Sequence, residues 1–399
     1  MKIGVWLGFE LKESAGGAFS YTDRLIEMID RHNFPNGIEI CFVYMIGGKQ
    51  LHKEVFSIID FPEFYVSFVK KNRIFHRLLM EICNFYIKLR GLKSILSKTG
   101  ISIMYYPHQG QCLDSNFPFI ATNWDIGHRS THAFPEVMWD GKSFEVRENF
   151  YRNILPKALM IFCESETGKK EIMQYTNIGE HKIRVLPLFS GSVTTVKLSD
   201  YEGHEILKSL ELKENEYFFY PAQFWAHKNH AGLVKAFAEI AKKYPNFKLV
   251  LSGSDKGNKD YIKSVVSELG ISDRVIFLGF VPIETLYCMY KYSTALVMAS
   301  HFGPTNMPPI EAMEIGCPVS CSDLGGHREI LGDAASYFDS YNIDSIIKAM
   351  YEIMDNNDMY RERIIRRRDL SLYTSIKSMS VLDGLLEEVV NIRANWKDY

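Results

Sequence analysis

Short apolar runs and amphipathic stretches take turns along this chain. In the second half, runs rich in β-forming residues occur at 217–220, 248–252, 275–278, 295–299, 319–321 and 336–338. Most of the stretches between them show helical periodicity; after residue 230, for example, apolar side chains recur on one face, lysines fall elsewhere, and Pro245 ends the segment. Strands that alternate with helices predict a parallel, doubly wound α/β sheet.

The first half repeats this plan less regularly. Strands are predicted near 3–7, 38–44, 102–106, 119–123, 160–163 and 184–186, and helices at about 18–30, 74–96, 145–155 and 166–175. Residues 188–205 are rich in Gly, Ser, Thr and charged side chains, which predicts a linker. A chain of 399 residues suits two domains, which we place at 1–190 and 191–372. Two Rossmann-like domains would face each other across a cleft at the carboxyl ends of their strands.

Composition narrows the class of protein. The chain is 46% hydrophobic and 24% charged, as expected for a globular protein, and its 46 Lys and Arg against 48 Asp and Glu give no overall attraction to nucleic acid. Its seven cysteines are scattered without a Cys-x-x-Cys pair, which argues against a disulfide framework or a zinc site and favours the cytoplasm. No apolar run approaches the roughly 18 residues of a membrane span.

The stretch 301–313 carries the most specific chemistry in the sequence. Pro308 or Pro309 suits the first turn of a helix, where a missing N–H costs nothing. The backbone amides of the three preceding residues can then converge on an anion at the helix N-terminus, and Glu311, one turn into the helix, can accept hydrogen bonds from hydroxyl groups. This stretch therefore predicts a binding site for a negatively charged ligand.

Four more segments accompany this loop in a fixed order, at 220–230, 249–254, 277–282 and 322–329. With them the C-terminal half, roughly 220–337, resembles the retaining GT-B glycosyltransferases of family 4 (glycosyl transferases group 1) of the bacterial polysaccharide and O-antigen type. The resemblance implies an α/β GT-B fold, with two Rossmann-like doubly wound domains facing an interdomain cleft. It also implies that a C-terminal helix within 373–399 crosses back to the N-terminal domain.

The resemblance assigns donor-site roles to particular residues. Lys228 would contact the diphosphate of a nucleotide-sugar as a catalytic cation, and Glu311 would hold the ribose. The base would lie near Ser254, Phe280 and Pro282, with ordinary loop packing as the alternative. Two positions depart from the family pattern, because its phosphate-contacting Arg falls on Gln223 and the first Glu of its Glu-x7-Glu element falls on Gly303. The other donor-loop residues implied are Pro304, Thr305, Asn306 and Met307.

The N-terminal half supplies candidates for the opposite face of the cleft. Gly16 and Gly17 follow the first strand, where paired glycines let the backbone approach phosphate or sugar closely; a plain turn is the alternative. Asp125 and His128 follow the strand at 119–123 and resemble the family's His-Asp loop. Either could orient the sugar or the acceptor, and a structural histidine is the alternative.

These features together predict a metal-independent glycosyltransferase without a cofactor, since the sequence contains no Asp-x-Asp motif. The resemblance implies that it transfers a sugar from a nucleotide-diphosphate-sugar to a glycan or lipid-linked glycan in surface polysaccharide biosynthesis, with the configuration retained. The segment 69–93 mixes cations with large apolar groups and could rest on the inner face of the membrane, or it could be a core-facing helix with a solvated basic side. A sugar-nucleotide epimerase or hydrolase and a noncatalytic nucleotide-sugar-binding scaffold remain as alternatives.

Overall fold

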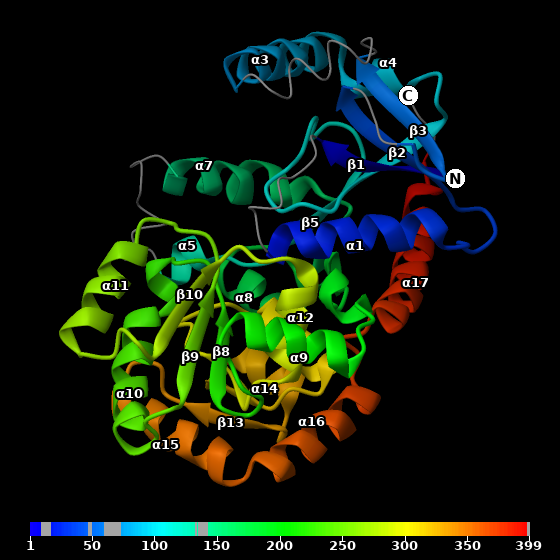
Figure 1. The fold of residues 1–399 in the computed structure, drawn as a ribbon. Helices are drawn as coiled ribbons and strands as arrows, with labels where there is room; N and C mark the ends of the chain where they lie inside the picture. The colour runs from blue at the N-terminus through cyan, green and yellow to red at the C-terminus, as the bar shows by residue number, and fades with distance from the viewer. Residues whose placement is uncertain (9–16, 47–49, 60–72, 132–133, 135–142, 397–399) are drawn as a thin grey trace.

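Two parallel β-sheets, one in each half of the chain, organise this computed structural model (Figure 1). The structure describes residues 1–8, 17–46, 50–59, 73–131, 134 and 143–396. Every strand predicted from the sequence is present, with ends within two residues of the prediction. The predicted parallel, doubly wound architecture is therefore confirmed in both halves.

The N-terminal sheet has seven strands in the order β3-β2-β1-β4-β5-β6-β7. They are β1 (Lys2–Gly8), β2 (Glu39–Ile46), β3 (Glu54–Ile59), β4 (Ile101–Tyr106), β5 (Phe119–Asn123), β6 (Met160–Cys163) and β7 (Ile183–Val185). Its helices are α1 (Gly17–Arg31), α3 (Arg73–Arg90), α4 (Leu92–Leu96), α5 (Gly127–Ser130), α7 (Ser143–Asn149) and α8 (Glu166–Tyr175). β3 is not predicted from the sequence, because most of its side chains are only partly buried and, among the described strands, it lies at the edge of the sheet beside β2.

The C-terminal sheet has six strands in the order β10-β9-β8-β11-β12-β13. They are β8 (Tyr217–Pro221), β9 (Lys248–Ser252), β10 (Val275–Gly279), β11 (Ala295–Met298), β12 (Val319–Ser322) and β13 (Ala335–Phe338). The surrounding helices are α9 (Asp200–Ser209), α10 (His230–Lys243), α11 (Lys259–Glu268), α12 (Ile283–Lys291), α13 (Met307–Ile315), α14 (Gly325–Leu331), α15 (Ile343–Asp355) and α16 (Asn357–Leu370). Its central strands are almost wholly buried, as expected for a sheet covered on both faces.

The linker prediction is wrong at its C-terminal end. Residues 200–209 form α9, whose start is fixed by a capping box: the Ser199 hydroxyl accepts from the Glu202 amide, and the Glu202 carboxylate accepts from the Ser199 amide. A polar composition like that of this segment is typical of a helix cap as well as of a linker. The residues between β7 and α9 connect the two sheets and include a short 3-10 helix at Ser192–Thr195.

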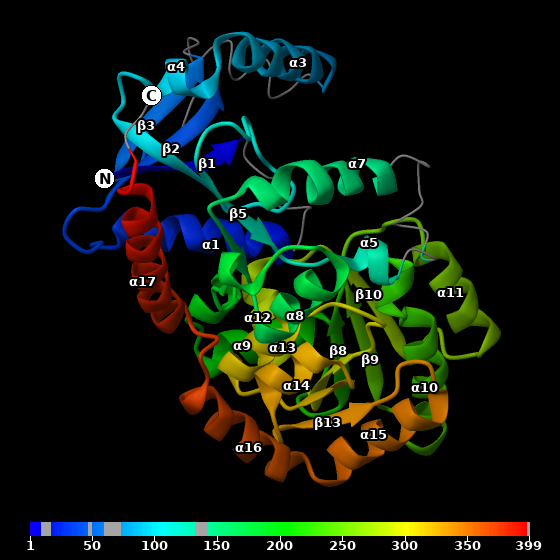
Figure 2. The ribbon, with the colours of Figure 1, turned by 180° about the vertical axis from the view of Figure 1, so that it is seen from behind.

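The last helix, α17 (Ser375–Arg393), packs on the N-terminal half beside α1 (Figures 1 and 2). The Ser378 hydroxyl donates to the Pro187 carbonyl at 2.7 Å, and the His32 ring lies 2.8 Å from Asp383. The chain therefore returns from the C-terminal sheet and ties the two halves together, which is the arrangement that the resemblance implies for 373–399.

Strand order places the functional region. In each sheet the chain winds outward in both directions from a central pair, β1 beside β4 and β8 beside β11. Loops that leave such a pair at the carboxyl ends diverge to opposite faces of the sheet and open a crevice between them. The 301–313 loop follows β11, and the 222–230 segment follows β8. Both therefore emerge at the switch point of the C-terminal sheet.

Candidate active site

A cavity of about 890 Å³ lies between the carboxyl ends of the two sheets. Its size is typical of a site for a nucleotide-sized ligand. The N-terminal half contributes residues including Gly17, Phe19, Ser20, Tyr21, Trp124, Asp125 and Glu164. The C-terminal half contributes the candidate donor residues Gln223, Lys228, Ser254, Phe280, Pro282, Gly303, Pro304, Thr305, Asn306, Met307 and Glu311. One cavity thus brings together nearly all the residues singled out in the sequence.

His128 is not among the described residues that line this cavity. Gly16 lies outside the described residues. His128 is fully buried on α5, where its ring packs on Tyr151 and its Nε2 lies 2.9 Å from Glu148. Arg129 also binds Glu148 with two hydrogen bonds, and this contact lowers the pKa of the carboxyl group to about 2. The geometry therefore favours the structural alternative for His128, because its Nε2 is engaged by the buried Glu148 carboxylate and the residue is not among those that line the cavity.

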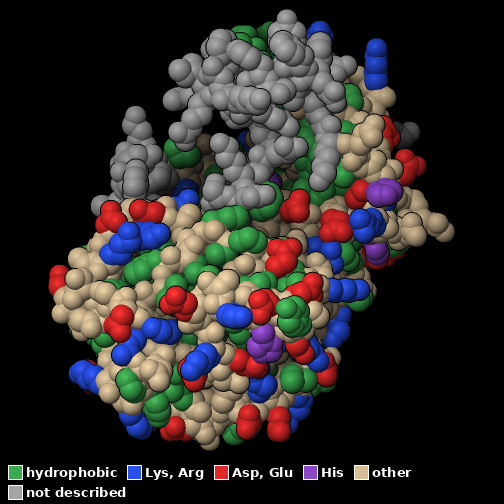
Figure 3. Space-filling model, in the orientation of Figure 1, with side chains coloured by type: hydrophobic (Ala, Val, Ile, Leu, Met, Phe, Trp, Pro, Cys, Tyr) green, Lys and Arg blue, Asp and Glu red, His purple; other side chains and the backbone are tan. Residues whose placement is uncertain are grey.

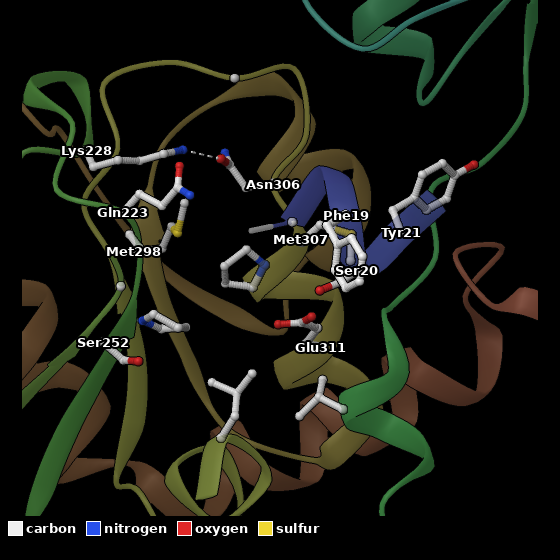
Figure 4. Close-up of a pocket in the computed structure, with 18 of the residues that line it drawn as sticks. Phe19, Ser20, Tyr21, Gln223, Lys228, Ser252, Met298, Asn306, Met307 and Glu311 are labelled. Atoms are coloured by element: carbon white, nitrogen blue, oxygen red, sulfur yellow. Dashed lines mark hydrogen bonds between the residues drawn. The ribbon is translucent and has the colours of Figure 1, made fainter. Parts of the chain in front are cut away.

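Lys228 is the one Lys or Arg side chain among the described residues that line the cavity. It ends a 3-10 turn at Ala226–Lys228, and its carbonyl accepts a 2.8 Å hydrogen bond from the Tyr220 hydroxyl. The ammonium group donates to Asn306 Oδ1 at 2.9 Å (Figure 4). On the surface face in Figure 3, basic and acidic side chains are interspersed over the C-terminal half. Charge attraction for an anion inside the cleft is therefore local and centred on Lys228.

The loop before α13 meets the cavity as predicted, but its helix offers few free amides. The helix begins at Met307, so both prolines lie in its first turn, at its second and third residues. Since proline has no N–H, Met307 alone among the first three helical residues has one to offer. The loop amides and the Lys228 ammonium must therefore supply most of the donors for an anion at this end of the cavity.

Glu311 lies one turn into α13 and is buried on the cavity floor. The Tyr290 hydroxyl donates to its Oε2 at 2.6 Å. Burial raises the pKa of Glu311 to about 7, although the Tyr290 hydrogen bond opposes this rise. The carboxyl group is consequently poised to change charge near neutral pH, and a ligand hydroxyl that donates to it would favour the ionised form.

Gly303 stands in this structure where the family pattern has a glutamate, and the backbone explains why. Its φ is +131°, a conformation that favours glycine. A Cβ at this position would lie 2.9 Å from Asn306 Nδ2 and 3.1 Å from the Thr305 carbonyl. The loop therefore has its own conformation, in which the space next to position 303 is occupied by the side chain of Asn306.

Gln223 occupies the position of the other family departure. Its Oε1 accepts a 3.0 Å hydrogen bond from the Trp225 indole N–H, a group that can only donate. The oxygen of the amide is thereby turned toward Trp225, which makes its –NH2 group the end that offers hydrogen bonds elsewhere. Gln223 can therefore act as a neutral donor on the same cavity wall as Lys228.

The opposite wall of the cavity comes from the N-terminal half. Met307 approaches Gly17 so closely that a Cβ on this glycine would lie 3.2 Å from Met307 Cγ. Asp125 Oδ1 accepts from the Gly127 amide at 3.0 Å, which folds its loop into a tight turn. A Cβ on Gly127 would lie 2.8 Å from the Phe302 ring. Both glycines thus permit close contact between the two halves at the rim of the site.

Sequence comparison agrees with this geometry. Residues 204–369 match the family model described as glycosyl transferases group 1. This segment belongs to the glycosyl transferases group 1 family. Among curated relatives, the chain is 26% identical over 242 residues to an uncharacterised glycosyltransferase of Methanocaldococcus jannaschii, covering 59% of this chain and 60% of that protein. It is 27% identical over 212 residues to the O-antigen chain mannosyltransferase B of Escherichia coli, covering 52% and 54%. The chain therefore matches little more than half the length of these relatives.

Solved structures show the same fold over nearly the whole chain. Sucrose-phosphate synthase from Thermosynechococcus elongatus superposes with a TM-score of 0.72 at 17% identity, covering 98% of this chain and 100% of that one. Anabaena HepE, in a complex with UDP-glucose, superposes with a TM-score of 0.67 at 16% identity, covering 97% and 100%. The two-sheet arrangement of this chain is therefore the GT-B fold.

Two further residues of the N-terminal half, Glu164 and Gln109, contribute to this site through contacts between distant segments. Glu164 follows β6 and lines the cavity, and burial raises its pKa well above the usual range. The neighbouring Ser165 caps α8, where its side chain accepts from the Gly168 amide. Gln109 Oε1 accepts from the amides of Trp124 and Asp125 and so holds their loop in place. Such roles depend on contacts between distant segments, which spacing along the chain does not reveal.

Proposed function

We propose that this protein is a retaining glycosyltransferase that transfers a sugar from a nucleotide-diphosphate-sugar to a glycan or lipid-linked glycan acceptor. The observation that carries the proposal is the convergence of Lys228, the loop before α13 and Glu311 on one interdomain cavity. The order of these elements resembles the donor site of group 1 enzymes, and the family match covers the same half of the chain.

The chemistry follows from the charges around the cavity. As the glycosidic bond breaks, the leaving diphosphate gains negative charge, which Lys228 and the loop amides are placed to stabilise. Removing one such preorganised donor costs on the order of 3 kcal/mol in the barrier. The buried Glu311 carboxylate would accept from the ribose hydroxyls. By the resemblance, the leaving phosphate oxygen takes the acceptor proton on the same face, so no strong general base is required.

The acceptor would bind on the N-terminal side of the cavity. Trp124 and Tyr21 lie there with their rings 6.2 Å apart, beside the carboxylate of Asp125. Aromatic faces with a neighbouring carboxylate suit a sugar, whose C–H face is apolar and whose hydroxyls donate hydrogen bonds. One relative, 28% identical over 205 residues, is a Campylobacter jejuni N-acetylgalactosaminyltransferase named for a diphospho-undecaprenol-linked substrate. This name motivates a lipid-linked acceptor for the present protein.

We further propose that α3 rests on an anionic membrane. Ile82, Phe85 and Leu89 lie within two turns of this helix and are 52%, 67% and 73% exposed. Basic residues Lys88, Arg90 and Lys93 lie beside them in the sequence, as in helices that lie in a lipid interface. The helix stands at the edge of the molecule away from the C-terminal sheet (Figure 1). Within the described residues, no helix is long and apolar enough to span a bilayer.

The donor is tested by direct binding and turnover. The purified protein is screened by thermal shift against GDP-mannose, UDP-glucose, dTDP-glucose and ADP-glucose, and the donor that binds is incubated with and without lipid-linked oligosaccharide. We expect transfer only when acceptor is present, and none with Glu311→Ala. Release or epimerisation of the sugar without acceptor would support the epimerase or hydrolase, and binding without any turnover would support the scaffold. Full turnover by Glu311→Ala would refute the proposed site.

The membrane contact is tested by sedimentation with vesicles of phosphatidylglycerol and phosphatidylethanolamine. Phe85→Ser combined with Leu89→Ser should weaken binding, because each removes an exposed apolar side chain from α3. Tyr201→Ser is the matched control, since this side chain is also exposed (76%) but belongs to α9 in the other half. Equal sedimentation of the double variant and the wild type would exclude α3 as the contact.

A further inference from the structure

A chain of polar contacts leads from Lys228, on the cavity wall, to His327, which is not among the described residues that line the cavity. The Lys228 ammonium donates to Asn306 Oδ1 at 2.9 Å, Asn306 Nδ2 lies 3.0 Å from His327 Nε2, and His327 Nδ1 lies 2.7 Å from the Ser322 carbonyl. His327 is fully buried on α14, and Asn306 is almost fully buried. The series therefore runs from the cavity wall into the interior of the C-terminal domain.

Each step of this chain has only one possible hydrogen-bond direction. A carbonyl oxygen can only accept, so His327 Nδ1 must carry the proton that meets the Ser322 oxygen. Burial lowers the pKa of His327 to about 4, so the ring is neutral near pH 7 and its Nε2 is an acceptor. Asn306 must then turn its –NH2 group to His327 and its oxygen to Lys228. A reversed amide would put two donors, the –NH2 group and the ammonium, against each other.

The backbone around this chain is built to hold it. A Cβ on Gly326 would lie 1.2 Å from the Pro304 carbonyl oxygen, so α14 packs directly against the donor loop. Gly303 leaves the space that the Asn306 amide fills, as described above. The two glycines let the loop and α14 approach closely enough for Asn306 to meet His327.

We infer that His327 is a positioning residue for the donor site: it fixes the orientation of the Asn306 amide, which in turn holds the Lys228 ammonium toward the diphosphate. This inference rests on the proposed function, because it assigns Lys228 to a diphosphate. Its importance follows from the composition of the cavity. Among the described lining residues Lys228 is the one Lys or Arg side chain, and a single cation on a flexible stem binds best when its direction is fixed in advance.

The test measures how well the protein distinguishes a nucleoside diphosphate from its monophosphate. UDP, GDP, dTDP and ADP are screened by thermal shift, and the best of them is compared with its own monophosphate by calorimetry. For wild type we expect a clear preference for the diphosphate. His327→Phe keeps the ring volume but removes the acceptor, and it should reduce this preference about tenfold, which equals about 1.4 kcal/mol. His327→Gln offers an oxygen to Asn306 and should retain most of it.

A double-mutant cycle separates positioning from general destabilisation. If His327 acts through Lys228, His327→Phe should change the preference in wild type but add almost nothing to Lys228→Ala. Tyr217→Phe is the matched control for stability, because it removes a buried hydroxyl that donates to the Cys288 and Met289 carbonyls, and neither of these residues is among those that line the cavity. It should leave the preference unchanged.

The outcomes are distinguishable. If wild type prefers none of the four diphosphates over its monophosphate, the proposed function fails and the inference with it. If wild type has the preference and Lys228→Ala removes it, but His327→Phe retains it, the proposed function stands and the positioning role of His327 is refuted. Additive effects of His327→Phe and Lys228→Ala would also refute it, because independent losses show that the two residues do not act as one unit.

Discussion

The buried carboxyl group of Glu311 should make the stability of this protein depend on pH in an unusual direction. Burial raises its pKa from 4.5 to about 7 in the folded protein. Between these values the folded state binds more protons than the unfolded state, so the contribution of Glu311 to stability falls as pH rises. From pH 5 to pH 8 this loss amounts to about 2.5 kcal/mol. Glu311→Gln has no charge to bury and should escape the loss.

The measurement is urea unfolding of wild type and Glu311→Gln at pH 5, 6, 7 and 8. The free energy of unfolding of the variant, relative to wild type, should increase by about 2.5 kcal/mol over this range. Glu202→Gln is the matched control: its carboxylate, on the exposed cap of α9, has a pKa lowered by Ser199, so its effect should stay constant from pH 5 to 8. Parallel pH profiles for wild type and Glu311→Gln would refute the reasoning.

The same group couples ligand binding to pH. Ribose hydroxyls that donate to Glu311 favour the ionised carboxylate, so a bound nucleotide should lower the pKa of this group and release a proton. The affinity of wild type for a nucleoside diphosphate should therefore fall as pH drops below about 7. Glu311→Gln should bind more weakly and lose this dependence. Calorimetry in buffers of different ionisation enthalpy detects the released proton, and its absence in wild type would show that the ribose does not contact Glu311.

Three further predictions concern the departures from the family pattern and the expected independence of the activity from metal ions. Gln223→Arg should increase nucleoside diphosphate affinity about tenfold, or 1.4 kcal/mol, by adding a second cation beside Lys228; calorimetry showing no gain would mean that position 223 does not reach the phosphates. Gly303→Ala should lower the free energy of unfolding by about 1–3 kcal/mol, since φ is +131° there, and an unchanged urea midpoint would contradict this strain. Transfer activity should persist in EDTA, whereas a loss restored by Mg²⁺ or Mn²⁺ would show that the enzyme uses a metal.

The fold could be predicted from sequence because its signals are local. Each buried strand is a short apolar run between helices of clear periodicity, and alternation of the two implies parallel sheets. The failures are local too. β3 is an edge strand with partly exposed side chains, and the cap at Ser199 lies in a segment whose polar composition also suits a linker. In both cases the hydrophobic pattern that predicts a strand or a helix is weak, because part of the segment is exposed to solvent.

Only part of the candidate site could be predicted from the sequence. Lys228 and Glu311 could be located because they stand in recognisable segments at the ends of strands, and strand order brings those segments together. The hydrogen bonds that hold these two side chains could not be predicted. Their partners include Tyr290 and, through Asn306, His327, which are buried residues of α12 and α14 whose spacing along the chain resembles that of ordinary core positions. His128 is the opposite case. Its position near the end of a strand suggested a role in binding the sugar or the acceptor, but its ring contacts the buried Glu148.

The two departures from the family pattern are best understood together. Gln223 replaces a positive charge and Gly303 replaces a negative one, so the pair of changes leaves the formal charge of the site unaltered. A glutamate at 303 would place a carboxylate in this loop, whereas here the Lys228 ammonium donates to the neutral oxygen of Asn306. The family pattern has two cations and one carboxylate at these positions. Here one cation, Lys228, and one neutral amide, Gln223, would take their place. Restoring only the cation, as in Gln223→Arg, therefore shifts the balance toward tighter diphosphate binding, and slower product release is the expected consequence for turnover.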